Sequence, residues 1–454
     1  MHNRQQFPNL IFGASLRPEG AALAIMLLLP FLIFVLLFMT LTAQTAQAQT
    51  YKVIYTFTGG ADGATPYAGV TLDKAGNLYG TAFFGGDLAC DAPNGCGTVY
   101  KLTHKGSGWT FNPLYSFAGG SDGAGSSARV IFGPNGTLYS TTWMGGTGTN
   151  CSYGGGATSC GTVFNLRPFP SVCKTGLCPW METVLYDFTG YPNDGGLPFF
   201  GDLLFDQAGN AYGTTYEGGG SDLCGGDGCG TVYQLTPSGS GWTEGVLHSF
   251  TGPPDGENPY SGVIFDQAGK LYGTTSSGGT GGGGVVYQLT PSESGWTEKV
   301  LYNFQGGPDG AAPIAGLIFD QSGNLYGATF SGGGNGGGTV FKLTPSGGTW
   351  TYSALYYLSG PPARACGPEG TLVMDGAGNL YGTTLCDGIY SFGSVFKLTP
   401  SGGRWSYTSL HDFTNSSDGR YPYSNVAFDA NGNLYGTASA GGSQGFGVVW
   451  QITP

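Results

Sequence analysis

The phrase Asp-Lys-Ala-Gly-Asn-Leu-Tyr-Gly-Thr at residues 73–81 returns along the whole chain in closely related forms, and this repeat limits what the chain can fold into. Its tyrosine occurs seven times, at intervals of 54 to 73 residues, as Tyr79, Tyr139, Tyr212, Tyr272, Tyr326, Tyr381 and Tyr435. A period of this length with short strands indicates an architecture of similar units. The copies determine the fold class, but they do not indicate an activity.

Each unit contains four short segments rich in β-branched and aromatic residues. In the fourth unit they are residues 259–266, 271–276, 285–289 and 296–304. Gly, Pro, Asp or Ser bounds each segment, which is typical of half-buried antiparallel strands joined by tight turns. A meander of four such strands is the blade of a β-propeller.

The two ends of the repeat region complement each other. Residues 51–57 match the fourth segment of other units, such as residues 299–304, whereas the last unit reaches Pro454 after its third segment. The first segment is therefore expected to complete the last unit and leave no unpaired seam. We predict an all-β, seven-bladed β-propeller with four antiparallel strands per blade, closed by the N-terminal strand.

Several motifs follow the tyrosine phrase in most units: Gly-Gly, then Gly-Thr-Val-Phe/Tyr-x-Leu-Thr-Pro, then Gly-Gly-x-Asp-Gly. Together they resemble the GloVer repeat of exported bacterial proteins, over residues 51–454. The resemblance implies an extracellular location and no established activity. The first hairpin is also similar to the Asp-x-x-Gly-x-Leu-Trp-x-Gly-Thr turn of two-component-regulator propellers, with Tyr in place of Trp.

The N-terminus has the features of a secretory signal. Two arginines precede an apolar stretch at residues 21–39, and Ala46 and Ala48 form a small-residue cleavage site. We therefore expect residues 1–48 to be a signal peptide and residues 49–454 to be one secreted, periplasmic or cell-surface domain. The apolar stretch approaches the length that spans a bilayer, so an uncleaved membrane anchor is the alternative.

The charge and the cysteines narrow the function classes. A formal net charge of -12 repels nucleic acid and anionic membrane, so we expect neither as a partner, apart from an uncleaved anchor. In an exported chain, ten cysteines in close-spaced pairs favour disulfides, with zinc ligation as the alternative. The expected pairs are Cys90/Cys96, Cys151/Cys160, Cys173/Cys178, Cys224/Cys229 and, joined by the fold, Cys366/Cys386. We expect a monomer without a cofactor or a metal.

Residues present in every unit are explained by the unit, so candidate site residues are those that depart from it. Arg129 and Asp202 stand in neighbouring units where other units have glycine. Aromatic residues in the first three units, where the fourth and seventh units have Ser276 and Ser439, are Phe83, Trp143 and Tyr216. These departures predict a binding patch on the face that carries the variable loops. The alternative is that Arg129 and Asp202 only pair with each other while the aromatic residues fill space.

Two function classes remain. The first is an exported binding or interaction propeller for a glycan or another extracellular polymer, or for a surface protein, because aromatic rings stack on sugars. The alternative is a hydrolase or lyase acting on an anionic sugar, whose carboxylate would be held by Arg129, Arg364 and Arg420. The recurring aspartates before each first segment are interpreted as turn formers, with a cation-binding ring as the alternative. They are Asp62, Asp122, Asp194, Asp255, Asp309 and Asp418.

Overall fold

The structure, a computed structural model, describes residues 49–454 apart from 107, 153–158, 170–179, 240 and 361–364. Residues Thr50–Thr453 form one compact unit. The expected signal at residues 1–48 lies outside the described residues and stays a prediction. Within the described part of the chain, no helix has the length and apolar character needed to cross a membrane.

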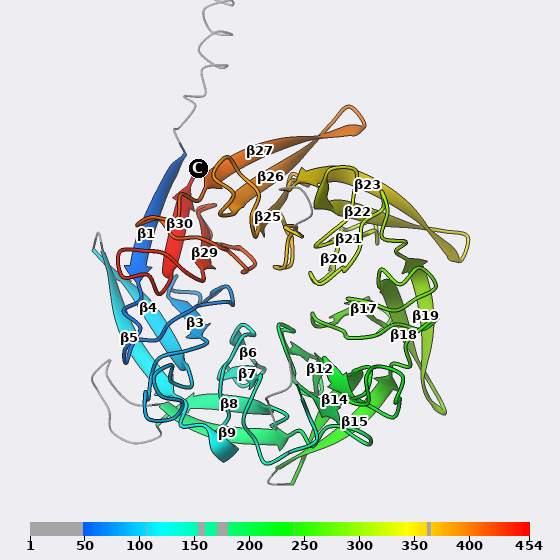
Figure 1. Cartoon of the computed structure of the whole chain (residues 1–454), viewed down its shortest axis with the longest axis horizontal. Helices are drawn as coiled ribbons and strands as arrows, with labels where there is room; N and C mark the ends of the chain where they lie inside the picture. The colour runs from blue at the N-terminus through cyan, green and yellow to red at the C-terminus, as the bar shows by residue number, and fades with distance from the viewer. Residues whose placement is uncertain (1–48, 107, 153–158, 170–179, 240, 361–364) are drawn as a thin grey trace, which may run out of the picture. The chain divides into compact units, whose positions relative to one another are not determined.

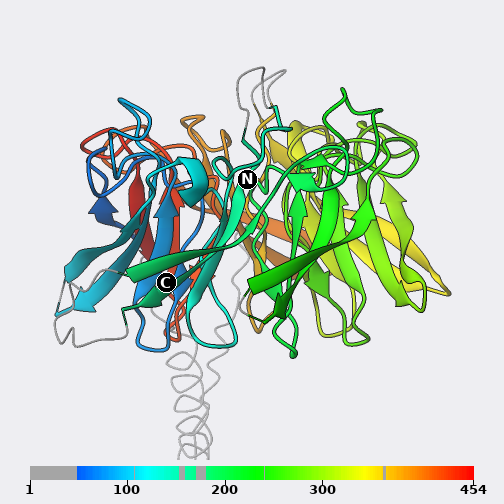
Figure 2. The same ribbon diagram turned by 90° about the horizontal axis from the view of Figure 1, so that it is seen from below.

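Seven four-stranded antiparallel sheets follow one another along the unit and form a ring (Figure 1). In blade 4 the strand order is β16 (Ile264–Phe265), β17 (Leu271–Thr275), β18 (Val285–Ser292) and β19 (Gly295–Asn303), from the inside of the ring outward. The predicted seven-bladed propeller is confirmed. Seen from the side, the loops that join β17 to β18 and their equivalents lie at one end of the blades, and the short hairpins lie at the other (Figure 2).

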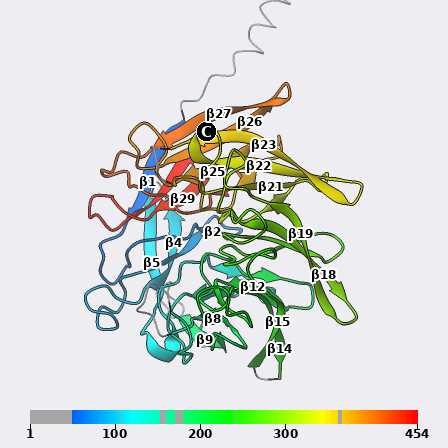
Figure 3. The ribbon, with the colours of Figure 1, turned by 45° about the vertical axis from the view of Figure 1, so that its right-hand side comes forward.

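The other blades repeat this order, with the short inner strands toward the centre in the oblique view (Figure 3). Blade 1 consists of β2 (Thr71–Leu72), β3 (Leu78–Ala82), β4 (Thr98–Lys105) and β5 (Gly108–Ser116). Blade 2 consists of β6 (Ile131–Phe132), β7 (Leu138–Thr142), β8 (Thr162–Pro168) and β9 (Trp180–Asp187). Blade 3 consists of β11 (Leu204–Phe205), β12 (Ala211–Thr215), β14 (Thr231–Ser238) and β15 (Gly241–Ser249). Blade 5 consists of β20 (Ile318–Phe319), β21 (Leu325–Ala328), β22 (Gly336–Ser346) and β23 (Thr349–Ser359). Blade 6 consists of β24 (Val373–Met374), β25 (Leu380–Thr384), β26 (Ser394–Ser401) and β27 (Arg404–Asp412). The short pair β10 (Gly195–Gly196) and β13 (Glu217–Gly218) and the 3₁₀ turn η1 (Gly120–Asp122) lie in the loops.

Blade 7 is built from both ends of the unit, as the sequence predicts. It contains β28 (Ala427–Phe428), β29 (Leu434–Ala438), β30 (Val448–Thr453) and, as its outer strand, β1 (Thr50–Thr56). Strand β1 pairs antiparallel with β30, so that the N-terminal strand closes the ring. A side chain also joins the first and last blades, because Thr437 Oγ1 donates a hydrogen bond to the carbonyl of Ala68 at 2.9 Å.

The residues of the tyrosine phrase each have a structural task. In blade 4, the hydroxyl of Tyr272 donates to Asp266 Oδ2 at 3.0 Å, which ties the second strand to the first hairpin. Gly273 faces the ring of Tyr287, and a Cβ there would overlap that ring. Thr274 Oγ1 donates to the carbonyl of Ala315 in blade 5 at 3.3 Å. The repeated residues therefore build the blade and join it to its neighbour.

The predicted strand bounds need two corrections. Only Ile264–Phe265 of the expected inner strand at 259–266 pairs in the sheet. The preceding residues do not pair with the second strand of their own blade. The carbonyl of Ser261 instead accepts a hydrogen bond from Thr214 Oγ1 of the neighbouring blade at 2.9 Å. The second hairpin is tighter than expected, because Ser292 pairs with Gly295 and only two residues form the turn.

Four of the five predicted disulfides are present in the described residues: Cys90–Cys96, Cys151–Cys160, Cys224–Cys229 and Cys366–Cys386. They indicate folding in an oxidising environment. The fifth pair, Cys173 and Cys178, lies outside the described residues and stays a prediction. Peptide mapping without reduction should recover these two cysteines in one cross-linked peptide. Free thiols at either position, or a partner elsewhere in the chain, would contradict the predicted pairing.

The contacts between blades change character around the ring. Among the described residues, rings from outer strands stack at four junctions. The pairs are Tyr302 and Tyr352 at 4.5 Å, Tyr356 and Tyr407 at 5.1 Å, Tyr51 and His411 at 3.6 Å, and Tyr55 and Phe111 at 4.5 Å between centroids. In blades 2, 3 and 4 the position of Tyr352 is a glutamate. These glutamates are Glu182, Glu244 and Glu298, and each has a buried Oε1 without a hydrogen-bond partner among the described residues. Burial, followed by repulsion from a nearby turn aspartate, raises the pKa of Glu182 to about 8 and those of Glu244 and Glu298 to about 7.

These raised pKa values predict that the folded state is stabilised by mild acid. Between the unfolded pKa, near 4.3, and the folded values, the native state binds more protons than the unfolded state, so stability falls as pH rises from about 5 to 8. Thermal unfolding in one buffer series should give a lower melting temperature at pH 8 than at pH 5.5. Replacing all three glutamates by glutamine should flatten this slope. A melting temperature that rises over the same interval would contradict the assignment.

Candidate functional site

The inner segments of the blades enclose a central cavity of about 470 Å³. Its wall is mostly aliphatic, with residues at one level of the inner strands in five blades: Ile131, Leu204, Ile264, Ile318 and Val373. Its polar lining is Arg129, Asp202, Thr371 and Asn425. Each of them stands two residues before the first residue of the inner strand of its blade, and we call this position the polar level. An apolar cavity with a few convergent polar groups is the usual form of a small-ligand site.

Arg129 and Asp202 lie in this polar level and pair with each other. Arg129 Nη2 and Nε donate to Asp202 Oδ2 at 2.7 and 3.0 Å, and the Arg129 backbone N–H donates to Oδ1 at 3.2 Å. Both side chains remain partly accessible, at 27% and 30%. The pairing that the sequence left open is therefore present. It neutralises the guanidinium, so Arg129 is not a free clamp for an anionic sugar.

A second, much smaller chamber of about 30 Å³ adjoins the polar level, and all seven blades contribute to its lining. The bulky side chains that enclose it come from the residues just before the polar level: Tyr67, Phe200, Ile314, Glu369 and Tyr423. Glu369 Oε2 is buried and has no hydrogen-bond partner in the part of the chain that the structure describes, and burial raises the pKa of this carboxyl to about 8. A buried, unpartnered carboxylate oxygen is costly, which marks the chamber as a candidate site.

Aromatic rings form a continuous cluster next to the chamber. We call it the aromatic patch, and it consists of Tyr67, Phe83, Trp143, Phe199, Phe200, Tyr216, Tyr260 and Tyr423. Successive ring centroids lie 4.6 to 6.2 Å apart from Phe83 through Trp143, Phe199 and Phe200 to Tyr260 and Tyr216. Tyr67 and Tyr423 join it through Phe200, at 5.8 and 6.5 Å. All members except Phe83 are half-buried, so they keep accessible surface.

The predicted aromatic residues have different surroundings within the patch. Trp143 and Tyr216 are half-buried and lie where strands β7 and β12 lead into their loops. Phe83 is only 5% exposed and packs edge-on against Tyr67 at 5.3 Å. Phe83 therefore supports its neighbours and does not present a ring to a ligand.

Of the two other predicted arginines, only Arg420 belongs to the described residues. Arg364 lies outside the described residues. The guanidinium of Arg420 lies 5.1 Å from the ring centroid of Tyr421, and its backbone N–H donates to Ala440 at 2.8 Å. Arg420 lines neither the cavity nor the chamber. Arg129 and Arg420, the two members of the predicted set that the structure describes, therefore do not share one cavity.

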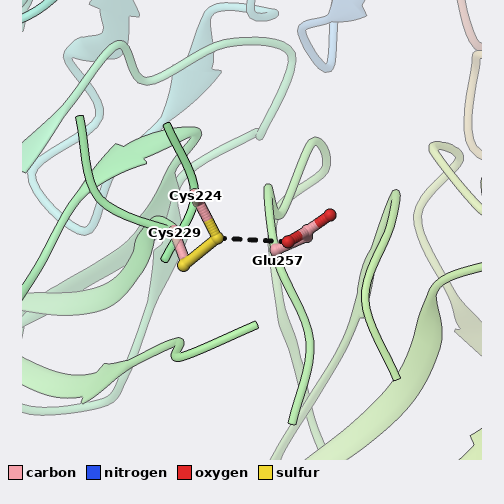
Figure 4. Close-up of side chains that lie close together, drawn as sticks. All are labelled: Cys224, Cys229 and Glu257. Carbon is pink, nitrogen blue, oxygen red and sulfur yellow. Dashed lines mark hydrogen bonds between the residues drawn. A yellow bond between two sulfur atoms is a disulfide. The ribbon is translucent and has the colours of Figure 1, made fainter. Parts of the chain in front are cut away.

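Two possible cation sites, a cysteine–glutamate cluster and the recurring aspartates, have other partners in the described part of the chain. Cys224 Sγ lies 3.1 Å from Glu257 Oε2, as Figure 4 shows, but Cys224 is bonded to Cys229 and offers no thiolate. The recurring aspartates act within their own turns, as expected of turn formers. Asp255, for example, accepts from the Thr251 backbone N–H at 2.9 Å and contacts His248 Nε2 at 3.2 Å.

Comparison with known proteins agrees with this architecture. The sequence model of the Gloeobacter/Verrucomicrobia repeat matches residues 40–221, 149–306 and 293–454. The chain belongs to this repeat family. No curated protein matches it. Similar solved structures include a Dyadobacter fermentans protein of unknown function (12% identity, 89% of this chain and 99% of that chain covered, TM-score 0.42) and a gluconolactonase from Xanthomonas campestris (15%, 74% and 86%, TM-score 0.36). These likenesses carry no argument about the activity of this member of the repeat family.

Sequence reasoning missed five aromatic residues of the patch and Glu369. Tyr67, Phe200, Tyr260 and Tyr423 occupy one repeat position, two residues before the polar level, and Phe199 adjoins it. Recurring residues were expected to serve only the blade, so these rings were not among the predicted site residues. The signal in the sequence is the carboxylate of Glu369, which stands at a position where four units of this repeat-family protein have an aromatic residue.

Proposed function

We propose that this chain is an exported binding propeller whose aromatic patch binds a glycan. The observation that carries the proposal is the patch itself, a continuous set of rings from blades 1, 2, 3, 4 and 7, all of which except Phe83 are half-buried. Planar aromatic faces stack on the apolar faces of sugar rings, and nearby polar groups fix their orientation. The chamber and the Arg129–Asp202 pair supply such groups next to the patch. The disulfides and the expected signal support an extracellular setting.

Replacing Trp143 by alanine tests the proposal. Loss of one stacking surface should weaken binding of a glycan found by array screening about tenfold, which corresponds to roughly 1.4 kcal/mol. Affinity should be measured by calorimetry, with thermal unfolding in parallel. The matched control is Trp296→Ala in blade 4, whose side chain packs in the hydrophobic core between blades 3 and 4. This control should lose stability and keep affinity. Equal affinities for the wild type and Trp143→Ala would contradict a site at the patch.

An enzyme acting on an anionic sugar has less support, because Asp202 already neutralises Arg129. Product analysis of the same binding mixtures separates the two classes. We expect the bound glycan to be recovered unchanged after long incubation. Cleavage products that require the folded protein would favour the hydrolase or lyase.

A further inference from the structure

Three rings of the chamber are arranged as the sides of a box. The rings of Phe200 and Tyr423 are nearly parallel, with an interplanar angle of 7° and centroids 6.5 Å apart. Tyr67 stands almost perpendicular to both, at 82° to Phe200 and 89° to Tyr423, with centroids 5.8 and 5.0 Å away. These three rings come from blades 1, 3 and 7 and line the chamber together with Glu369 of blade 6.

The size of the chamber limits what can enter it. Its volume of about 30 Å³ has room for a group of roughly water size. A positive group among aromatic faces is attracted by the negative faces of the rings, and the attraction grows when water is excluded. The carboxyl of Glu369 also lines the chamber, and its buried Oε2 has no hydrogen-bond partner within the described residues. A small hydrogen-bond-donating cation satisfies both features.

We infer that the chamber takes a primary ammonium group, so that the glycan bound at the patch carries free amino groups. The inference rests on the proposed glycan function and names its substrate class. An ammonium group presents three donors in a small volume, whereas an acetylated amine is neutral and too large for the chamber. Arg129 does not oppose the bound cation as a free charge, because Asp202 pairs with it at 2.7 Å.

Binding of the ammonium should be linked to proton release. Burial raises the pKa of Glu369 to about 8, so without a ligand the carboxyl is mostly protonated at pH 7. The titratable groups that line the chamber with it are Tyr67, Tyr423, Arg129 and Asp202. Charge pairing with the ammonium favours the ionised carboxylate, so the bound cation replaces the proton. Calorimetry at pH 7 in buffers of different ionisation enthalpy should detect this release in the wild type.

The test compares glucosamine oligomers with N-acetylglucosamine oligomers of equal length, for the wild type and for Glu369→Gln. The wild type should bind the free-amine oligomer about tenfold or more tightly, and Glu369→Gln should remove the preference and the proton release. The matched control is Glu182→Gln, which changes a half-buried glutamate of raised pKa outside the chamber and should keep both. Equal wild-type affinities for the two oligomers, or a preference that survives Glu369→Gln, would overturn the inference.

Comparing the effects of Trp143→Ala and Glu369→Gln distinguishes a failure of the ammonium site from a failure of the proposed glycan patch. If Trp143→Ala weakens both oligomers while Glu369→Gln changes neither, the patch stands and the ammonium site is rejected. If Glu369→Gln removes the preference while Trp143→Ala has no effect, the ammonium site stands and the patch assignment fails. Methylammonium chloride tests the amine alone. Competition with the glucosamine oligomer that is lost in Glu369→Gln supports the chamber, and competition that persists in this variant overturns it.

Discussion

Deletion of residues 50–56 is expected to destabilise the whole propeller, because it removes the outer strand of blade 7 and reopens the ring. Strand β1 pairs along the full length of β30, and Tyr51 stacks on His411 of blade 6 with centroids 3.6 Å apart. Its loss exposes one side of a core cluster that contains the fully buried Trp450. At ~25 cal/mol per Å² of apolar surface, the cost is on the order of 5 kcal/mol.

The measurement is the denaturant midpoint of the truncated chain, compared with a chain that lacks only residues 1–48. The second chain keeps β1 and controls for removal of the expected signal. The shorter chain should unfold at clearly lower denaturant concentration and expose more apolar surface to a fluorescent dye. An unchanged midpoint would show that β1 does not close the ring.

Replacement of Gly273 by alanine is expected to cost about 1–3 kcal/mol, the usual range for overpacking a core. A Cβ on Gly273 would overlap the hydroxyl and ring of Tyr287 on the neighbouring strand. Both residues lie in the blade core, and the tyrosine hydroxyl is buried without a hydrogen-bond partner within the described residues. The added methyl therefore has to displace a ring that is packed on all sides.

Blade 2 provides the natural control for this substitution. It carries Ser140 at the glycine position, and the paired residue is Phe164, which lacks the hydroxyl. Gly273→Ala should therefore cost less in a Tyr287→Phe background than in the wild type, measured by urea unfolding of all four chains. Equal costs in the two backgrounds would show that the hydroxyl does not impose the glycine.

The sequence predicted the parts of the fold that each unit encodes locally. Four segments per unit, turn aspartates and close cysteine pairs all act over a few residues or within one blade. Closure was also predictable, because residues 51–57 carry the pattern of an outer strand. The extent of the inner strands was not, because residues such as Ser261 bond to the neighbouring blade and not along their own sheet.

The candidate site was only partly predictable, since it forms where seven inner segments meet. Arg129 and Asp202 stood out as charges at glycine positions, and the structure brings them together. The box around Glu369 depends on the relative orientation of rings from blades that are far apart in sequence. No pattern within one unit reports that orientation, although Glu369 itself interrupts an aromatic repeat position.

A crystal structure of the propeller with a bound glucosamine oligomer is the most direct test of the aromatic patch and the ammonium site. We expect sugar density over Trp143, Phe199 and Tyr216, with one amino group between Phe200 and Tyr423 and within hydrogen-bond distance of Glu369. Sugar density confined to the aliphatic cavity beyond the Arg129–Asp202 pair, or on the outer strands, would contradict the proposed site.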